Sequence, residues 1–215
     1  IAQLAVVPLT MEEWNRQRNI CVTRNNKYSF ELGFATFYMN RTNRSGIIKG
    51  GVIGGMDQSG SWKMDARFKR EELIRRIESI AERKSHIKLY NKDINSFITR
   101  YIPLYEENAL VYFDPPYFKK GKQLYMNYFQ LEDHVRIEKA IRDYVKCDWI
   151  ITYDKTSEIE SIYRGYLMCL YDLNYSVSSK CKASELMIFK EGIKAPYNEE
   201  LQKQRIKINI RLCDT

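Results

Sequence analysis

Four consecutive residues, Asp114-Pro115-Pro116-Tyr117, have the types and spacing best suited to chemistry in this sequence. They follow an apolar run, Ala109 to Phe113, that reads as a buried strand. Proline fixes φ and cannot donate to a sheet ladder, so this turn is stiff and its carbonyls point in set directions. Two rigid acceptors beside an aromatic ring suit a flat ligand that bears an amino group. Ligands of open α/β sheets also bind where the strands end.

The bulk composition predicts one globular domain. The chain has 215 residues, of which 44% are hydrophobic, enough for one sizeable core over residues 1–215. The cysteines are scattered, which favours a reducing compartment over a disulfide framework or a zinc site; they are Cys21, Cys147, Cys169, Cys181 and Cys213. We expect no metal site, because no His, Cys or carboxylate cluster has ligand spacing. With no membrane-length apolar run and no leader, a cytoplasmic protein is expected.

The positive charge of the chain is concentrated in one stretch. The formal net charge is +8 and the pI about 9.1. Between Arg41 and Lys92 there are thirteen Lys and Arg against six Asp and Glu, so this stretch alone carries +7. Such a segment beside a pocket for a planar ring favours a polyanionic partner. A solvated basic face without a partner is the alternative.

Strands and helices are expected to alternate along the chain, which indicates a three-layer α/β domain. Residues 1–27 are expected to be peripheral, and the glycine-rich stretch 46–60 an irregular hairpin or loop. The last two strands are expected to form an antiparallel hairpin, followed by a charged tail that is helical or partly disordered. Helices are expected over 31–40, 69–84, 95–102, 131–146 and 157–164, and strands over 86–90, 109–113, 149–153, 166–177 and 185–189.

Three sequence segments, in the order in which they occur, resemble the motifs of a known family. FYMNRTNRSG spans Phe37 to Gly46, NKDI at 91–94 leads to YFDPPY at 112–117, and LYMNYFQLEDH spans 124–134. Together they resemble the D12-class, Dam-like DNA N6-adenine methyltransferases. In that family an Asn-Arg-Thr segment opens a target-recognition hairpin. The later stretches WIITYD at 149–154 and SELMIFK at 184–190 also fit, so the resemblance covers roughly residues 30–190.

The resemblance implies a fold and an activity. The fold would be a Rossmann-like, S-adenosylmethionine-dependent methyltransferase fold, present in part, with a target-recognition element at 40–70 and a C-terminal antiparallel hairpin. The activity would be site-specific methylation of a flipped-out adenine in double-stranded DNA, in a cytoplasmic, nucleoid-associated protein. The family's glycine-rich cofactor motif does not precede the Asn-Arg-Thr segment. We therefore expect that the N-terminal part of the fold is missing or that a second polypeptide supplies it.

Roles for the turn and for the NKDI segment follow from the resemblance. Asp114 and the carbonyl of Pro115 would accept from the two N–H groups of the adenine amine, and Pro116 would stiffen the turn. Tyr117 would stack on the flipped adenine. Asp93, with Ile94 as an apolar contact and Asp114 nearby, would bind S-adenosylmethionine. The structural alternatives are a Pro-Pro turn with a capping Asp and a helix N-cap at Asp93.

A further set of polar and basic residues is expected to contact DNA. Arginine suits guanine edges and phosphates, and lysine suits phosphates. Each of these side chains could instead be merely solvated. The set comprises Asn40, Arg41, Arg44, Lys49, Lys63, Arg67, Lys119, Lys120 and Lys122.

Two other functions stay open on the sequence alone. One is a catalytically incomplete DNA-binding remnant, or one part of a split methyltransferase. The other is a methyltransferase that acts on RNA adenine or on a protein glutamine. Asp114 at the first position of the motif, together with the Asn-Arg-Thr segment, favours DNA over glutamine.

Overall fold

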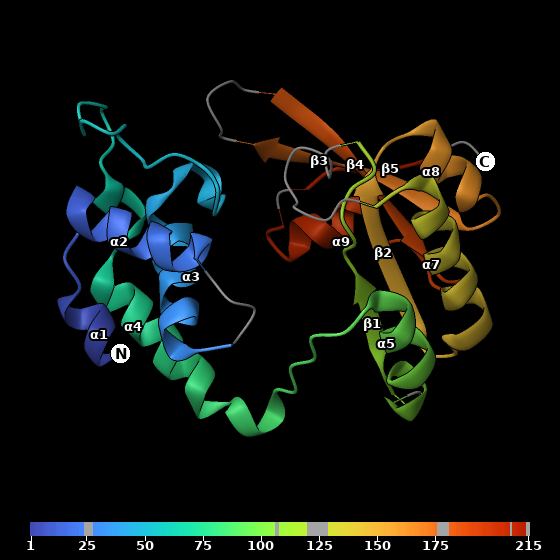
Figure 1. Ribbon diagram of the computed structural model, residues 1–215. Helices are drawn as coiled ribbons and strands as arrows, with labels where there is room; N and C mark the ends of the chain where they lie inside the picture. Colours follow the sequence, from blue (N-terminus) through green and yellow to red (C-terminus); the bar gives the residue numbers. More distant parts are fainter. Residues whose placement is uncertain (24–27, 106–107, 120–128, 176–180, 207, 214–215) are drawn as a thin grey trace. The chain divides into compact units, whose positions relative to one another are not determined.

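A computed structural model describes residues 1–23, 28–105, 108–119, 129–175, 181–206 and 208–213 (Figure 1). The chain divides into two compact units, Ile1–Tyr90 and Asn91–Thr215. Each unit has a hydrophobic core of its own. A single methyltransferase domain over 1–215 stays a prediction, because this division describes packing and not activity.

The first unit is helical in its described part. Two of its longer helices begin at hydroxyl N-caps: Thr10 accepts from the amide of Glu13 at 3.2 Å, and Ser29 from that of Leu32 at 3.1 Å. Its described residues form four α-helices and three short 3-10 helices, namely α1 (Ala2–Val6), α2 (Met11–Val22), α3 (Phe30–Thr42), η1 (Arg44–Gly46), η2 (Met64–Arg67), α4 (Arg70–Glu82) and η3 (Lys84–His86).

The N-terminal segment belongs to the core of the first unit, so its expected peripheral position is wrong. Leu4 and Trp14 are each only 2% exposed, and they pack in one cluster with Tyr38 of α3. The indole N–H of Trp14 donates to the side-chain oxygen of Asn43 at 2.8 Å. This segment therefore fixes the chain where the Asn-Arg-Thr segment leaves α3.

The region from α4 to the second unit differs from the sequence prediction. In α4 Leu73 is buried, but Ile80 on the same predicted face is 61% exposed. The apolar face of the helix therefore extends beyond the part that packs against the core. The strand expected over 86–90 is absent. Those residues form the end of η3 and an exposed irregular stretch, in which Leu89 is 94% exposed.

Where the structure describes it, the second unit is a five-stranded mixed sheet with helices. Its strand order is β1-β2-β4-β3-β5, with β1 parallel to β2 and each other neighbouring pair antiparallel. The strands are β1 (Leu110–Phe113), β2 (Asp148–Asp154), β3 (Leu167–Tyr175), β4 (Cys181–Phe189) and β5 (Ile210–Leu212). The helices are α5 (Ile94–Arg100), η4 (Ile102–Tyr105), α7 (Leu131–Tyr144), α8 (Ser157–Ile162) and α9 (Asn198–Lys203).

The expected antiparallel hairpin is present as β3 and β4, and the charged tail contributes both α9 and β5. Helices α5, α7 and α8 share one core with the sheet, and Figure 1 shows α7 and α8 along its side. The observed architecture is mixed α/β, while the Rossmann-like three-layer arrangement stays a prediction. Among the described helices, none is long and apolar enough to cross a membrane.

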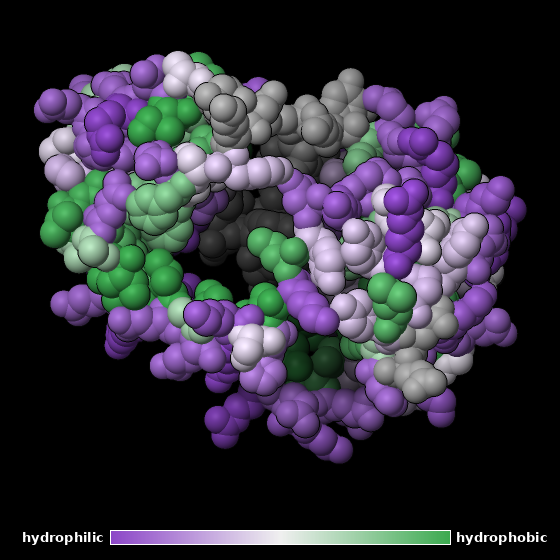
Figure 2. Space-filling model, turned by 60° about the horizontal axis from the view of Figure 1, so that its bottom comes forward, coloured by the Kyte–Doolittle hydropathy of each residue, from purple (hydrophilic) through white to green (hydrophobic). Residues whose placement is uncertain are grey.

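The two faces of the sheet differ in chemistry where β1 and β2 end. Directly opposed pairs such as Tyr153 and Leu186 face the core with the helices, and both are fully buried. Successive side chains of a strand point to opposite faces, so Thr152 and Glu185 lie on the other face. That face is polar, and the turn that follows β1 lies beside it. In the view of Figure 2, hydrophilic residues cover much of the surface of each unit.

Candidate active site

The turn that follows β1 carries one exposed carboxylate, Asp114, beside the buried Pro115. Phe113 is anchored in the core, and Asp114 emerges exposed on the polar side of the sheet. Its Oδ1 accepts from the hydroxyl of Thr152 at 3.3 Å, and that hydroxyl lies 2.8 Å from the hydroxyl of Tyr112. Among the described residues, no hydrogen bond reaches Oδ2 of Asp114 or the carbonyl oxygen of Pro115. Asp114 is exposed, so its Oδ2 is accessible to a ligand, whereas Pro115 is buried.

Tyr117, the last residue of the turn, is held by a buried carboxylate. Its hydroxyl donates to Oε2 of Glu185 at 2.7 Å, and the hydroxyl of Tyr171 on β3 donates to the same oxygen at 2.8 Å. Glu185 lies on β4 and is 1% exposed. Burial, followed by the bond to Glu185, raises the pKa of Tyr117 above its ordinary value, so the phenol keeps its proton.

A second buried carboxylate holds the backbone just after Tyr117. Asp154 ends β2 and is 5% exposed. Its Oδ1 accepts from the amide of Phe118 and its Oδ2 from that of Lys119, both at 2.8 Å. Bonds from backbone amides to a carboxylate are strong because the acceptor is charged. Asp154 is paired with Glu185 in the register of β2 and β4, so adjacent acids fix three consecutive residues, 117–119.

His134 packs beneath the same segment. It lies on α7, is fully buried, and has its Nδ1 3.0 Å from the hydroxyl of Tyr153. The rings of Phe118, Phe129 and Tyr153 surround it, with centroids 5.3–5.6 Å away. Burial lowers the pKa of His134 below its ordinary value, while the carboxylates of Asp133 and Asp154 oppose that shift. The imidazole is thus held neutral in an aromatic cage.

Asp93 is the N-cap of α5. Its Oδ1 accepts from the amide of Ser96 at 3.0 Å. The strand expected before it, over 86–90, is absent, so Asp93 follows an irregular stretch. Ile94 packs against the core of the second unit. Among the described residues no hydrogen bond reaches Oδ2 of Asp93, which is exposed, so a ligand can be bound while the cap is kept.

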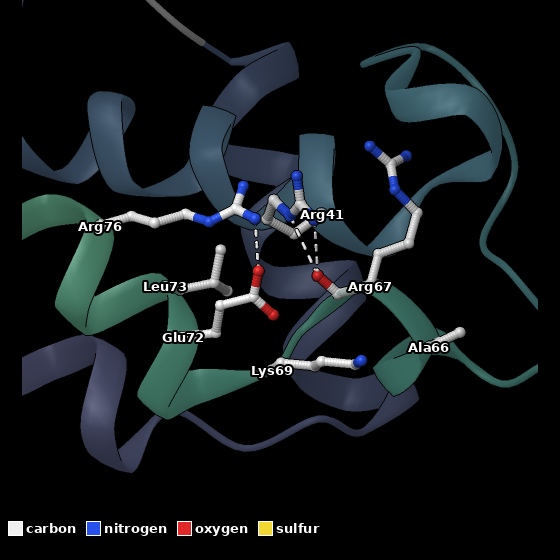
Figure 3. A pocket seen from close by; sticks show the side chains of 7 residues that line it. All are labelled: Arg41, Ala66, Arg67, Lys69, Glu72, Leu73 and Arg76. Carbon is white, nitrogen blue, oxygen red and sulfur yellow. Dashed lines mark hydrogen bonds and ion pairs between the residues drawn. The ribbon is translucent and has the colours of Figure 1, made fainter. Parts of the chain in front are cut away.

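A basic pocket of about 180 Å³ lies in the first unit (Figure 3). Nε and Nη2 of Arg41 donate to the carbonyl oxygen of Arg67, at 3.0 and 2.8 Å, and Arg76 pairs with Glu72. Partial burial and the charges of Arg67 and Arg76 lower the pKa of Arg41. Four cations and one carboxylate line this pocket, which therefore attracts anions; the lining residues are Arg41, Ala66, Arg67, Lys69, Glu72, Leu73 and Arg76.

The geometry can be set beside known families. A family model described as D12 class N6 adenine-specific DNA methyltransferase matches residues 12–177, more than three quarters of the chain. The chain belongs to this family. Among curated proteins, the search found no match.

In this family member the described residues of the turn and its continuation, Asp114 to Lys119, lie at one edge of the sheet and are held by side chains of the neighbouring strands. Three residues that support it were not recognised in the sequence: Thr152, Asp154 and Glu185. One feature of the sequence could have identified Asp154 and Glu185: each is an acid at the end of a largely apolar strand, in WIITYD and SELMIFK. Among the described residues, no group of three His, Cys, Asp or Glu could hold a metal ion. The catalytic and cofactor-binding roles stay predictions.

The residues expected to contact DNA are placed in different ways. Asn40 donates to the carbonyl of Gly46 at 3.0 Å, and Lys63 to that of Gln58, so both contribute to local structure. Arg44 and Lys49 are exposed in the first unit. Arg41 and Arg67 meet in the basic pocket. Lys119 is exposed in the second unit, and Lys120 and Lys122 lie outside the described residues.

Asn43 organises the Asn-Arg-Thr segment, although it was not singled out in the sequence. It is fully buried, and its side-chain amide donates to the carbonyls of Ile47 and Ile48 at 2.9 and 3.1 Å. Its oxygen accepts from Trp14. With all of these bonds, the buried amide of Asn43 holds the following loop against the helices.

Proposed function

We propose that the chain is a site-specific DNA adenine N6-methyltransferase, which transfers the methyl group of S-adenosylmethionine to an adenine flipped out of the duplex. The observation that supports this most is the exposed Asp114, whose Oδ2 accepts no hydrogen bond from the described residues, beside the carbonyl of Pro115. They stand in a turn whose flanks are held by Thr152, Asp154 and Glu185. Membership of the D12 class supports the same reaction.

The two acceptors address the weakness of the adenine amine as a nucleophile. Its lone pair is delocalised into the ring, so the nitrogen attacks poorly unless its N–H groups are bound. Asp114 and Pro115 would accept from these two N–H groups and stabilise positive charge that develops on nitrogen. Because the prolines fix the carbonyl direction, little reorganisation accompanies the reaction. Tyr117 would provide a stacking face for the flipped base.

The cofactor role is proposed for Asp93, Ile94 and Asp114. S-adenosylmethionine supplies an electrophilic methyl group when it is bound. Asp93 fits this role because its exposed Oδ2 can accept from an amino group while Oδ1 keeps the cap of α5. The parallel pair β1 and β2 supports a Rossmann-like site, since ligands of such sheets bind beyond the carboxyl ends of the strands.

The first unit is proposed to bind DNA. It contains sixteen Lys and Arg against nine Asp and Glu, which is +7 of the chain's +8. The basic pocket offers Arg41 and Arg67 to a backbone phosphate, while Asn40, Arg44, Lys49 and Lys63 lie in the same unit. Contacts of this kind set affinity and position on the duplex. Lys119, Lys120 and Lys122 are proposed to contact the flipped strand.

Substitution of Asp114 tests the reaction. In Asp114→Asn one acceptor oxygen becomes a donor, so we expect methyl transfer to fall about 100-fold or more while DNA affinity is unchanged. Asp148→Asn is a matched control, because it removes the same charge at the opposite end of β2, on a side chain that is 65% exposed. Full transfer by Asp114→Asn would show that the turn is only structural.

DNA binding without methyl transfer is the second candidate, and the confinement of charge to the first unit favours it. Calorimetry with S-adenosylmethionine separates the two. Heat of binding at micromolar to millimolar donor supports the methyltransferase. DNA binding with no heat at millimolar donor supports a binding protein.

A further inference from the structure

Two phenols converge on one buried carboxylate beside the catalytic turn. Oε2 of Glu185 accepts from Tyr117 at 2.7 Å and from Tyr171 at 2.8 Å. A carboxylate that is 1% exposed is costly to bury unless it is hydrogen-bonded, so these bonds bear on the stability of the arrangement. The opposite strand contributes Asp154, which holds the next two amides of the chain.

The ring of Tyr117 is thereby fixed at both of its ends. Its backbone follows two prolines, which restrict φ, and the amides of the two residues that follow are bound by Asp154. Its hydroxyl is tethered to β4 through Glu185. With both ends held, the position and the long axis of the ring are set before any base arrives, which lowers the ordering cost of stacking.

We propose that Glu185 is a positioning residue for methyl transfer, which orients the ring of Tyr117 so that a flipped adenine stacks in line with Asp114 and Pro115. This inference rests on the proposed function. Tyr171 holds the same carboxylate oxygen from β3 and so keeps Glu185 from following Tyr117 when the ring moves. Glu185 itself does not touch the base; it acts through Tyr117.

Two variants of Glu185 and one control define the test. Glu185→Ala removes the tether, whereas Glu185→Gln keeps the volume and one acceptor oxygen. Glu138→Gln is the matched control, since Glu138 is also a buried glutamate of the second unit. Its carboxylate accepts hydrogen bonds from Arg142 at 3.0 Å and from Tyr166 at 3.4 Å.

The expected kinetic signature is a change in kcat rather than in KM. Glu185→Ala should lower kcat about 10- to 100-fold, with KM for DNA nearly constant, because misplacement of a reacting group costs this much. The kcat of Glu185→Gln should lie between those of Glu185→Ala and the wild type, and the kcat of Glu138→Gln should equal that of the wild type. Because Glu185 acts through Tyr117, its effect on kcat should vanish in a Tyr117→Phe background. An equal loss in both backgrounds would overturn the inference.

A second readout keeps the inference testable if a variant folds poorly or methyl transfer is not seen. The chain is labelled with 3-fluorotyrosine, and Tyr117→Phe identifies the ¹⁹F resonance of Tyr117. We expect this resonance to move in Glu185→Gln and to stay in place in Glu138→Gln. An unmoved resonance in Glu185→Gln would overturn the inference. Absence of methyl transfer by the wild type, with the resonance moving as expected, would count against the proposed function alone.

Discussion

Three acids near the turn differ in their exposure to solvent and in what their oxygens bind. Asp114 is exposed and keeps one oxygen open, which suits a group that must meet a substrate. Asp154 and Glu185 are buried, and their oxygens bind the backbone and phenol of residues 117–119. Burial thus separates the acid proposed for chemistry from the acids that hold the structure around it.

His134 predicts a pH dependence of stability. Its folded pKa lies below the ordinary value of 6.5, so below about pH 6.5 the unfolded state binds more protons than the folded one. Stability is therefore complete above pH 6.5 and is lost as pH falls towards the folded pKa, by at most about 1.4 kcal/mol per pH unit. Urea unfolding of His134→Asn across this range should show a smaller pH dependence than the wild type.

The control for this prediction is the other histidine of the chain. His86 is exposed and lies in the first unit, so His86→Asn should keep the pH dependence of the wild type. If His134→Asn and the wild type lost stability in parallel between pH 6.5 and 5, another group would be responsible.

The parallel register of β1 and β2 brings Asp154 close to the turn that follows β1, and this predicts a structural cost for the loss of Asp154. Asp154→Asn puts an amide group against one of the two backbone N–H donors at 2.8 Å. We expect the second unit to lose about 1.5–3 kcal/mol, the range for a bond to a charged acceptor. The change in urea midpoint measures this, with the exposed Asp148→Asn as control; equal midpoints for the two variants would contradict it.

Local apolar patterns predicted several helices and strands of the second unit correctly. The apolar runs at 109–113 and 149–153 became β1 and β2, and the helix expected at 131–146 became α7. The stretch 86–90 alternates like a strand, but no described strand pairs with it, and alternation alone does not supply a ladder partner.

Roles that depend on distant contacts were not predictable in the same way. Trp14 packs with Tyr38 and donates to Asn43, which are both far away in sequence, so no local pattern predicts its burial. Asp154 and Glu185 become neighbours only through the antiparallel register of β2 and β4. The turn itself was found from sequence because its chemistry lies in four adjacent residues.

For the whole molecule, the uneven charge predicts how DNA binding depends on salt. Affinity should fall steeply as salt rises, because bound phosphates release counterions. Arg76→Gln removes one cation of the basic pocket, so we expect weaker binding to all sequences and a salt slope smaller by about one.

Arg136→Gln is the control, since Arg76 and Arg136 are 68% and 66% exposed and both pair with an acid on their own helix. Arg136 belongs to the second unit, and its loss should leave the salt slope unchanged. Fluorescence anisotropy at several salt concentrations measures both variants. Equal salt slopes of DNA affinity for Arg76→Gln and Arg136→Gln would show that the basic pocket does not contact DNA.

The most direct measurement is the product formed on DNA. The chain is incubated with duplex DNA and S-adenosylmethionine. The DNA is then digested to nucleosides, which are separated and identified by mass spectrometry. The account predicts N6-methyldeoxyadenosine with the wild type and none with Asp114→Ala. A wild-type reaction without this nucleoside, or equal amounts from wild type and Asp114→Ala, would contradict it.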